Sequence, residues 1–430
     1  MDATHTFGSA HFTIAAKELV ALHQLFKVGD DDSPEADRIR DALDAPLAAM
    51  DPIERKRAQW LSADLYSVSE PSPTFKLKEM NPQAERKISD SIMARKEERW
   101  DDALTLLRRW ENYMTPAFLS ARRGAIWRAA GYVEVALMFY GYAAEVEPDH
   151  EYYQAYYLDC LEHYDKDQAY KASDLVLAYD KVNPPLAVNQ AAAIRFTQIV
   201  LTSTTNASPD FRFLISKLRA NLSRIEGKEV RRRPWVSAHT MTTFLIGSCY
   251  RFLGEFAEAT KYYARGLEIN PNDSGLLTVR GILSYNSPAS NVHDFEVAKL
   301  RSPLIWPHFF LAHHALIKGK FSECNDLCQQ AMSKHGPDAA KSQVQEWRAI
   351  AQTELGYPLE QIRALFESAI QFDPLNETAK DNFDLFKAFL NSSETRASTT
   401  WERRSEVVIS RFAEPVTRQT DMVEPLVLAA

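Results

Sequence analysis

Residues 240–273 read TMTTFLIGSCYRFLGEFAEATKYYARGLEINPND and contain two helical patterns joined by a turn. Small residues recur at helical spacing, at Gly247, Ala259 and Gly266, where a second helix can approach closely. Three large side chains are placed to fill the space between the two helices: Tyr250, Phe256 and Tyr263. Pro271 cannot donate an intrahelical hydrogen bond and predicts the end of the second helix. The stretch therefore predicts a helix–turn–helix unit of 34 residues.

The same spacing recurs along most of the chain. Similar units are predicted at 84–117, 117–150, 305–338 and 339–376, a looser one at 151–184 and a shortened one at 274–303. Residues 186–237 fit as one irregular, lengthened unit, with helices near 187–203 and 211–226. Repetition at this period is typical of helical arrays.

The 34-residue pattern resembles the tetratricopeptide repeat (TPR). Eight slots of the family signature are occupied within 240–273, by Gly247, Tyr250, Gly254, Phe256, Ala259, Tyr263, Gly266 and Pro271. The resemblance covers residues 84–390. It implies an all-α fold, a right-handed superhelix of about seven or eight antiparallel helix pairs.

The flanks predict three further regions. Residues 1–67 show helical patterns at 10–27, 33–48 and 52–65, and we expect a cap on the first repeat. A DNA-reading helix-turn-helix is disfavoured, because its second helix, 33–48, is acidic. Residues 68–83 have the composition of a linker, and residues 391–430 that of a mobile tail.

Composition limits the class of protein. Of 430 residues, 45% are hydrophobic, which excludes wholesale disorder, and four cysteines cannot form a disulfide framework. The net charge of −8 makes a general nucleic-acid binder unlikely. We find no run of about 20 apolar residues that would span a bilayer. A cytoplasmic protein without a membrane segment is the expectation.

No local catalytic motif is evident, neither a phosphate-binding loop nor a zinc-protease helix nor a nucleophile elbow. We therefore expect no enzyme activity, no cofactor and no metal site. Cys324 and Cys328 lie four residues apart on one predicted helix, near several histidines. They occupy repeat slots that face the core, so buried packing is favoured over metal binding.

The resemblance to TPR proteins implies that the first helix of each pair lines a concave groove. The candidate groove residues are Arg95, Phe118, Arg128, Phe244, Ser248, Arg251, Phe252, Phe309 and His313. This mixture of aromatic and cationic side chains would suit a peptide or helix that carries acidic residues. The alternative is that these side chains pack against neighbouring helices.

Two short segments carry further hypotheses. Residues 228–235 form a dense basic patch with Arg231, Arg232, Arg233 and Trp235, which is either a solvated loop or an anchor for an anionic partner. The final residues Leu428, Ala429 and Ala430 resemble the end of the bacterial trans-translation degradation tag. The alternative there is an unrelated frayed end.

Together these features predict a non-catalytic scaffold or adaptor that binds another protein in the groove. Two other functions stay open. One is a regulatory solenoid that senses a ligand or peptide. The other is an RNA-binding solenoid that uses residues 228–235, which predicts a steep salt dependence.

Overall fold

A computed structural model describes residues 7–69, 76–178, 183–202, 207–226, 235–285 and 292–390. These residues form twenty α-helices and one short 3-10 helix. Apart from an isolated bridge between Leu304 and His335, the described residues contain no β-structure. The predicted all-α repeat fold is confirmed.

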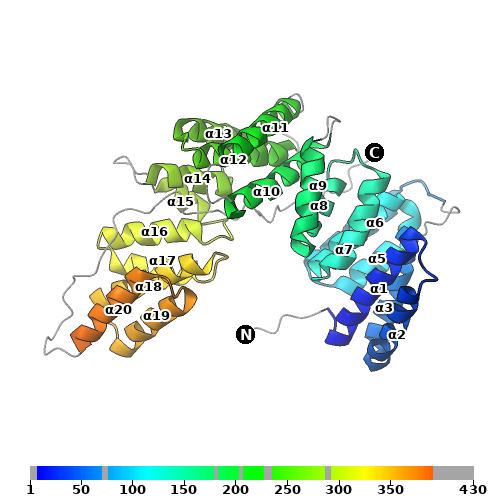
Figure 1. The fold of residues 1–430 in the computed structure, drawn as a ribbon, viewed down its shortest axis with the longest axis horizontal. Helices are drawn as coiled ribbons and strands as arrows, with labels where there is room; N and C mark the ends of the chain where they lie inside the picture. The colour runs from blue at the N-terminus through cyan, green and yellow to red at the C-terminus, as the bar shows by residue number, and fades with distance from the viewer. Residues whose placement is uncertain are drawn as a thin grey trace. The chain divides into compact units, whose positions relative to one another are not determined.

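The chain divides into two compact units, drawn in Figure 1 from blue to red along the sequence. Of the described residues, the first unit holds 7–207 and 223–225, and the second holds 208–222 and 226–390. We describe each unit by itself.

The first unit begins with three helices and continues with helix pairs. Its helices are α1 (Ala10–Val28), α2 (Pro34–Ala49), α3 (Pro52–Ser69), α4 (Pro82–Lys96), α5 (Trp100–Arg109), the 3-10 turn η1 (Glu111–Tyr113), α6 (Pro116–Ala129), α7 (Val133–Val146), α8 (Tyr153–Tyr164), α9 (Lys166–Ala178) and α10 (Pro185–Thr202). The predicted helix start at Ser33 is confirmed, because its side chain accepts a hydrogen bond from the Ala36 amide at 3.2 Å.

The second unit holds most of α11 (Ser208–Glu226) and a series of pairs closed by a single helix. The others are α12 (Trp235–Phe252), α13 (Phe256–Ile269), α14 (Ser274–Tyr285), α15 (His293–Ala298), α16 (Trp306–Ile317), α17 (Phe321–Ala331), α18 (Asp338–Glu354), α19 (Leu359–Phe372) and α20 (Glu377–Leu390). The end of α13 two residues before Pro271 matches the prediction.

Helices α1 and α3 pack against α7, so the N-terminal helices contact the second helix of the α6–α7 pair. An aromatic cluster forms part of this contact. The rings of Phe7 and Phe12 lie 5.5 and 6.2 Å from that of Trp127 on α6, and Tyr132 closes on Phe12 at 5.4 Å. The Phe12 and Trp127 rings are stacked and the other two pairs are edge to face, and aromatic pairs at these distances add stability beyond the area they bury.

A buried carboxylate reinforces the same contact. Asp64 on α3 pairs with Arg108 of α5 at 2.5 Å and with Arg123 of α6 at 3.0 Å. Arg123 also donates to the Ser67 hydroxyl at 3.0 Å. Charges this deeply buried are tolerated only when they are paired, so Asp64 fixes α3 against both helices.

Within a pair, a small residue on the first helix faces a large one on the second. A Cβ added at Gly247 would lie 2.3 Å from the ring of Tyr263, and one at Gly281 would lie 2.8 Å from the ring of Phe295. The contact between Gly124 and Tyr140 is looser, at 3.2 Å. The predicted packing of Tyr263 is thus confirmed, whereas Phe256 is half exposed and does not fill the pair.

Five of the turns inside the pairs share one backbone feature, a residue at positive φ. Four of them place a glycine at positive φ, at Gly131, Gly254, Gly319 and Gly356. The turn between α4 and α5 has Glu98 at φ 58° in that position. The left-handed region disfavours any residue with a Cβ, so this turn is strained where the others are not.

We expect Gly247→Ala to destabilise the second unit by about 1–3 kcal/mol, because the new methyl overlaps the Tyr263 ring. The change can be measured by urea unfolding. The double variant Gly247→Ala with Tyr263→Leu should lose less unfolding free energy than the two single variants lose in sum. Strict additivity would contradict the contact, and Gly124→Ala, at the looser contact, should cost less.

We expect Glu98→Gly to raise the free energy of unfolding by about 1 kcal/mol, because glycine adopts the left-handed conformation without strain. The matched change in the opposite direction is Gly131→Ala, at φ 91°. It should lower the free energy of unfolding by a similar amount. A Glu98→Gly variant no more stable than wild type in urea would show that this turn is unstrained.

Candidate functional site

In the first unit, the predicted groove residues Arg95, Phe118 and Arg128 are all partly exposed. Arg128, on α6, forms an ion pair with the buried carboxylate of Asp159 on α8. The Phe118 ring lies 4.8 Å from the guanidinium of Arg122. These side chains keep some surface for a partner, yet each of them already interacts with a neighbouring group.

In the second unit, Phe244, Ser248 and Arg251 are buried, at 5%, 1% and 5% exposure. The Ser248 hydroxyl lies 3.3 Å from that of Tyr263, inside the α12–α13 pair. The Arg251 guanidinium lies 4.8 Å from the ring of Phe252, which stays partly exposed. For these three side chains the alternative interpretation, packing against neighbouring helices, describes the geometry.

Phe309 and His313, on α16, lie inside the core of the second unit. The ring of Trp347 on α18 is 4.6 Å from that of Phe309. The Nδ1 atom of His313 is 2.8 Å from the hydroxyl of Tyr285 on α14. Both side chains therefore hold consecutive first helices together.

Sequence reasoning missed two buried carboxylates on α8. Burial raises the pKa of Asp159 against the nearby Arg128 charge. Burial also raises the pKa of Glu162, and the charge of Asp159 adds to the rise. Glu162 accepts a hydrogen bond from the amide of Gln190 on α10 at 3.4 Å. Their position in the repeat could have revealed them, because both lie at first-helix slots assigned to the groove. We had assigned those slots only in repeats that match the signature better.

The remaining predicted positions fall largely outside the described residues. This holds for Arg231, Arg232 and Arg233 of the basic patch and for Leu428, Ala429 and Ala430. Trp235 is described, as the partly exposed first residue of α12.

Cys324 and Cys328 are fully buried on α17, with their sulfur atoms 3.9 Å apart. Burial raises the pKa of the Cys328 thiol well above its usual value, and the neighbouring Cys324 adds to the effect. Both thiols pack as small core residues. In the described parts of the chain, no three His, Cys, Asp or Glu side chains are grouped to hold a metal ion.

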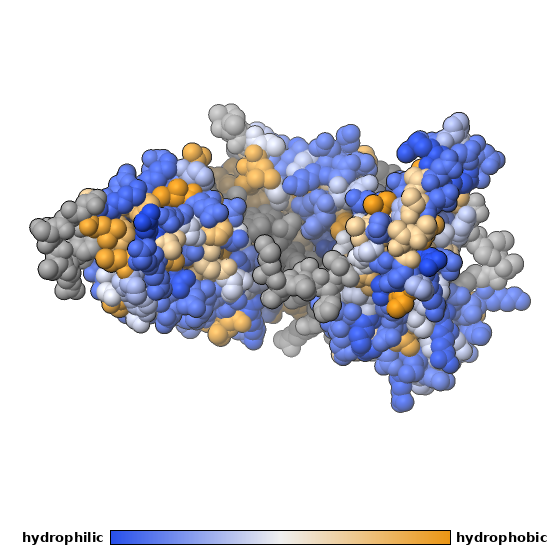
Figure 2. Space-filling view, turned by 90° about the horizontal axis from the view of Figure 1, so that it is seen from below, coloured by the Kyte–Doolittle hydropathy of each residue, from blue (hydrophilic) through white to orange (hydrophobic). Residues whose placement is uncertain are grey.

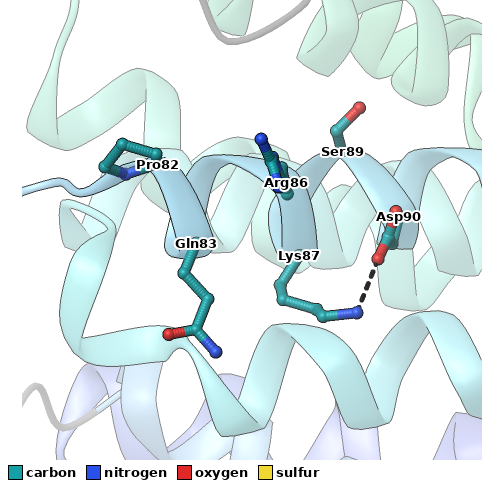
Figure 3. A pocket seen from close by; sticks show the side chains of 6 residues that line it. All are labelled: Pro82, Gln83, Arg86, Lys87, Ser89 and Asp90. Atoms are coloured by element: carbon teal, nitrogen blue, oxygen red, sulfur yellow. Dashed lines mark hydrogen bonds and ion pairs between the residues drawn. The ribbon is translucent and has the colours of Figure 1, made fainter.

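The exposed side of α4 holds a hollow of about 590 Å³. It is lined by Pro82, Gln83, Arg86, Lys87, Ser89 and Asp90 (Figure 3). Lys87 bonds Asp90 at 2.9 Å, whereas Arg86 forms no ion pair with another residue in the described ranges. Met93 follows on the same side of the helix and is 49% exposed. We call these seven residues the α4 surface.

Sequence reasoning did not select the α4 surface. Helical spacing places Gln83, Arg86, Asp90 and Met93 on one stripe, opposite the buried Ile88. This polar stripe was the available signal, and it lies outside the slots that the family resemblance assigns to the groove.

We searched the described helices for a membrane span, and none combines the length and the apolar character that crossing a bilayer requires.

No family model matches this chain, and no curated protein matches it. Several solved structures are similar to this chain, among them the following three. The C-terminal part of a TPR repeat-containing protein from Cytophaga hutchinsonii is 12% identical with a TM-score of 0.32, over 68% of this chain and 98% of that one. The P58(IPK) TPR domain is 14% identical with a TM-score of 0.23, over 73% and 100%. Yeast Tom70 is 15% identical with a TM-score of 0.22, over 68% and 76%.

We expect Glu162→Gln to stabilise the first unit at pH 7, because the amide keeps the contact with Gln190 without a buried charge. A carboxyl whose pKa rises on folding costs stability above its folded pKa, and this cost fades as the pH falls toward 4.5, the ordinary value. The gain in melting temperature should therefore shrink at pH 4.

The control is Asp44→Asn on the exposed side of α2. This change should leave the melting temperature unchanged at both pH 4 and pH 7. An equal gain for Glu162→Gln at pH 4 and pH 7 would show that the charge of Glu162 is not the cause.

Proposed function

We propose that this protein is a non-catalytic scaffold or adaptor that binds another protein through exposed faces of the first helices of its repeats. The α4 surface is the observation that carries the proposal. It combines amide and hydroxyl groups at Gln83 and Ser89, an exposed thioether at Met93, and a guanidinium at Arg86 that forms no ion pair within the described residues. Protein interfaces use such mixtures of polar and apolar groups around a shallow hollow.

The buried polar groups of the first helices are taken up in packing, so the candidate contacts for a partner are the partly exposed side chains. Arg128 is paired with Asp159, and Arg123 with Asp64, so these charges hold helices together. Arg95, Phe118, Arg128 and Phe252 keep partial exposure and stay candidate contacts for the partner. Figure 2 shows a mostly hydrophilic face on which hydrophobic residues gather in separate patches.

A cytoplasmic location is part of the proposal. The four cysteines are free and buried, as is usual for proteins of a reducing compartment.

The test is affinity isolation of the full chain from its native lysate, read by mass spectrometry. Wild type is compared with Arg86→Glu/Met93→Asp, which changes two side chains of the α4 surface. The matched control is Lys171→Glu/Leu175→Asp, the same chemical change on exposed positions of α9 in the same unit. Both variants should keep the melting temperature, because neither touches the core.

We expect a protein partner that the control retains and the α4 variant loses. Retention by both variants would move the contact to another surface. Recovery of RNA or a small molecule in place of a protein would favour one of the two other functions and overturn the scaffold.

A further inference from the structure

We propose that the α4 surface is a docking site for a segment of this same chain, residues 421–428. This inference goes beyond the proposed function and does not depend on it. A bound segment of the chain would compete with any partner for the α4 surface.

The chemistry of the α4 surface defines what it can bind. The α4 surface carries two cations, Arg86 and Lys87, and one acid, Asp90, in a chain whose net charge is −8. Lys87 pairs with Asp90 at 2.9 Å, and Arg86 forms no ion pair within the described residues. Arg86 and Lys87 line the hollow, and Met93 follows on the same side of the helix with an exposed apolar group. Such a surface favours a short segment that combines carboxylates with apolar side chains.

Residues 421–428 have this composition. They read DMVEPLVL, with Asp421 and Glu424 as the charged residues and five large apolar side chains. Residues 419–430 contain no lysine or arginine, unlike the preceding part of 391–430, which contains five arginines. The segment therefore presents negative charge and apolar groups together, as the α4 surface requires.

A long stretch of chain joins residues 421–428 to the last described helix. Thirty residues separate Leu390, the end of α20, from Asp421. An extended chain of this length reaches on the order of 100 Å, several times the length of α4. A tethered segment also needs little intrinsic affinity, because its effective concentration is about millimolar.

The test uses the full chain with a photo-reactive benzoylphenylalanine in place of Gln83. After irradiation and chymotryptic digestion, mass spectrometry identifies the segment attached to α4. We expect a cross-link to residues 419–430. Asp421→Lys/Glu424→Lys should reduce its yield about tenfold, since two attractive contacts become repulsive. Adding Arg86→Glu to that variant should restore part of the yield. The same probe at Lys171 on α9 should give no such product.

A mixture of isotopically light and heavy protein separates contacts within one chain from contacts between two. Cross-links within one chain that follow the charge changes support the proposal. Cross-links between chains would assign the surface to self-association and overturn it. A cross-link yield that does not change with the charge substitutions would overturn the proposal as well. So would attachment of the probe only to other segments. Either result would leave the scaffold proposal intact.

Discussion

The close contact between a glycine and an aromatic ring inside a helix pair is the constraint on which the fold depends. At Gly247 a side chain larger than hydrogen would overlap the Tyr263 ring. The close spacing of the two helices therefore requires glycine at this position. The same exchange of volumes recurs between Gly281 and Phe295. Stacking of pairs on one another then adds nearest-neighbour stability.

This packing also explains why the polar groups of the first helices are poor evidence for a binding site. The first helices α12 and α16 are buried over most of their length, so their polar side chains contact the next helix. His313 and Tyr285 show this in the second unit, and Arg128 and Asp159 in the first. Buried polar groups of this kind must be paired, and the pairing fixes the register of consecutive repeats.

The fold could be predicted largely from the sequence, because prolines and glycines mark the helix ends and turns through local physics. Pro271 and Gly254 determine their boundaries wherever the repeat lies. The candidate site could not be predicted to the same degree. Exposure of Phe309 or Arg251 depends on how closely the next pair approaches, and the slot pattern carries no information on that distance. Nor did the pattern mark Glu98, which occupies a glycine position without breaking the turn.

Asp64 links the N-terminal helices to residues that are synthesised later. Its two partners, Arg108 and Arg123, follow it by 44 and 59 residues in the chain. At typical elongation rates the ribosome needs about 3–12 s to reach the second of them. The carboxylate has neither partner until Arg108 is made and lacks the second until Arg123 follows, so α3 cannot settle in its final position on the nascent chain before then. The order of synthesis thus makes the beginning of this protein wait for its first repeats.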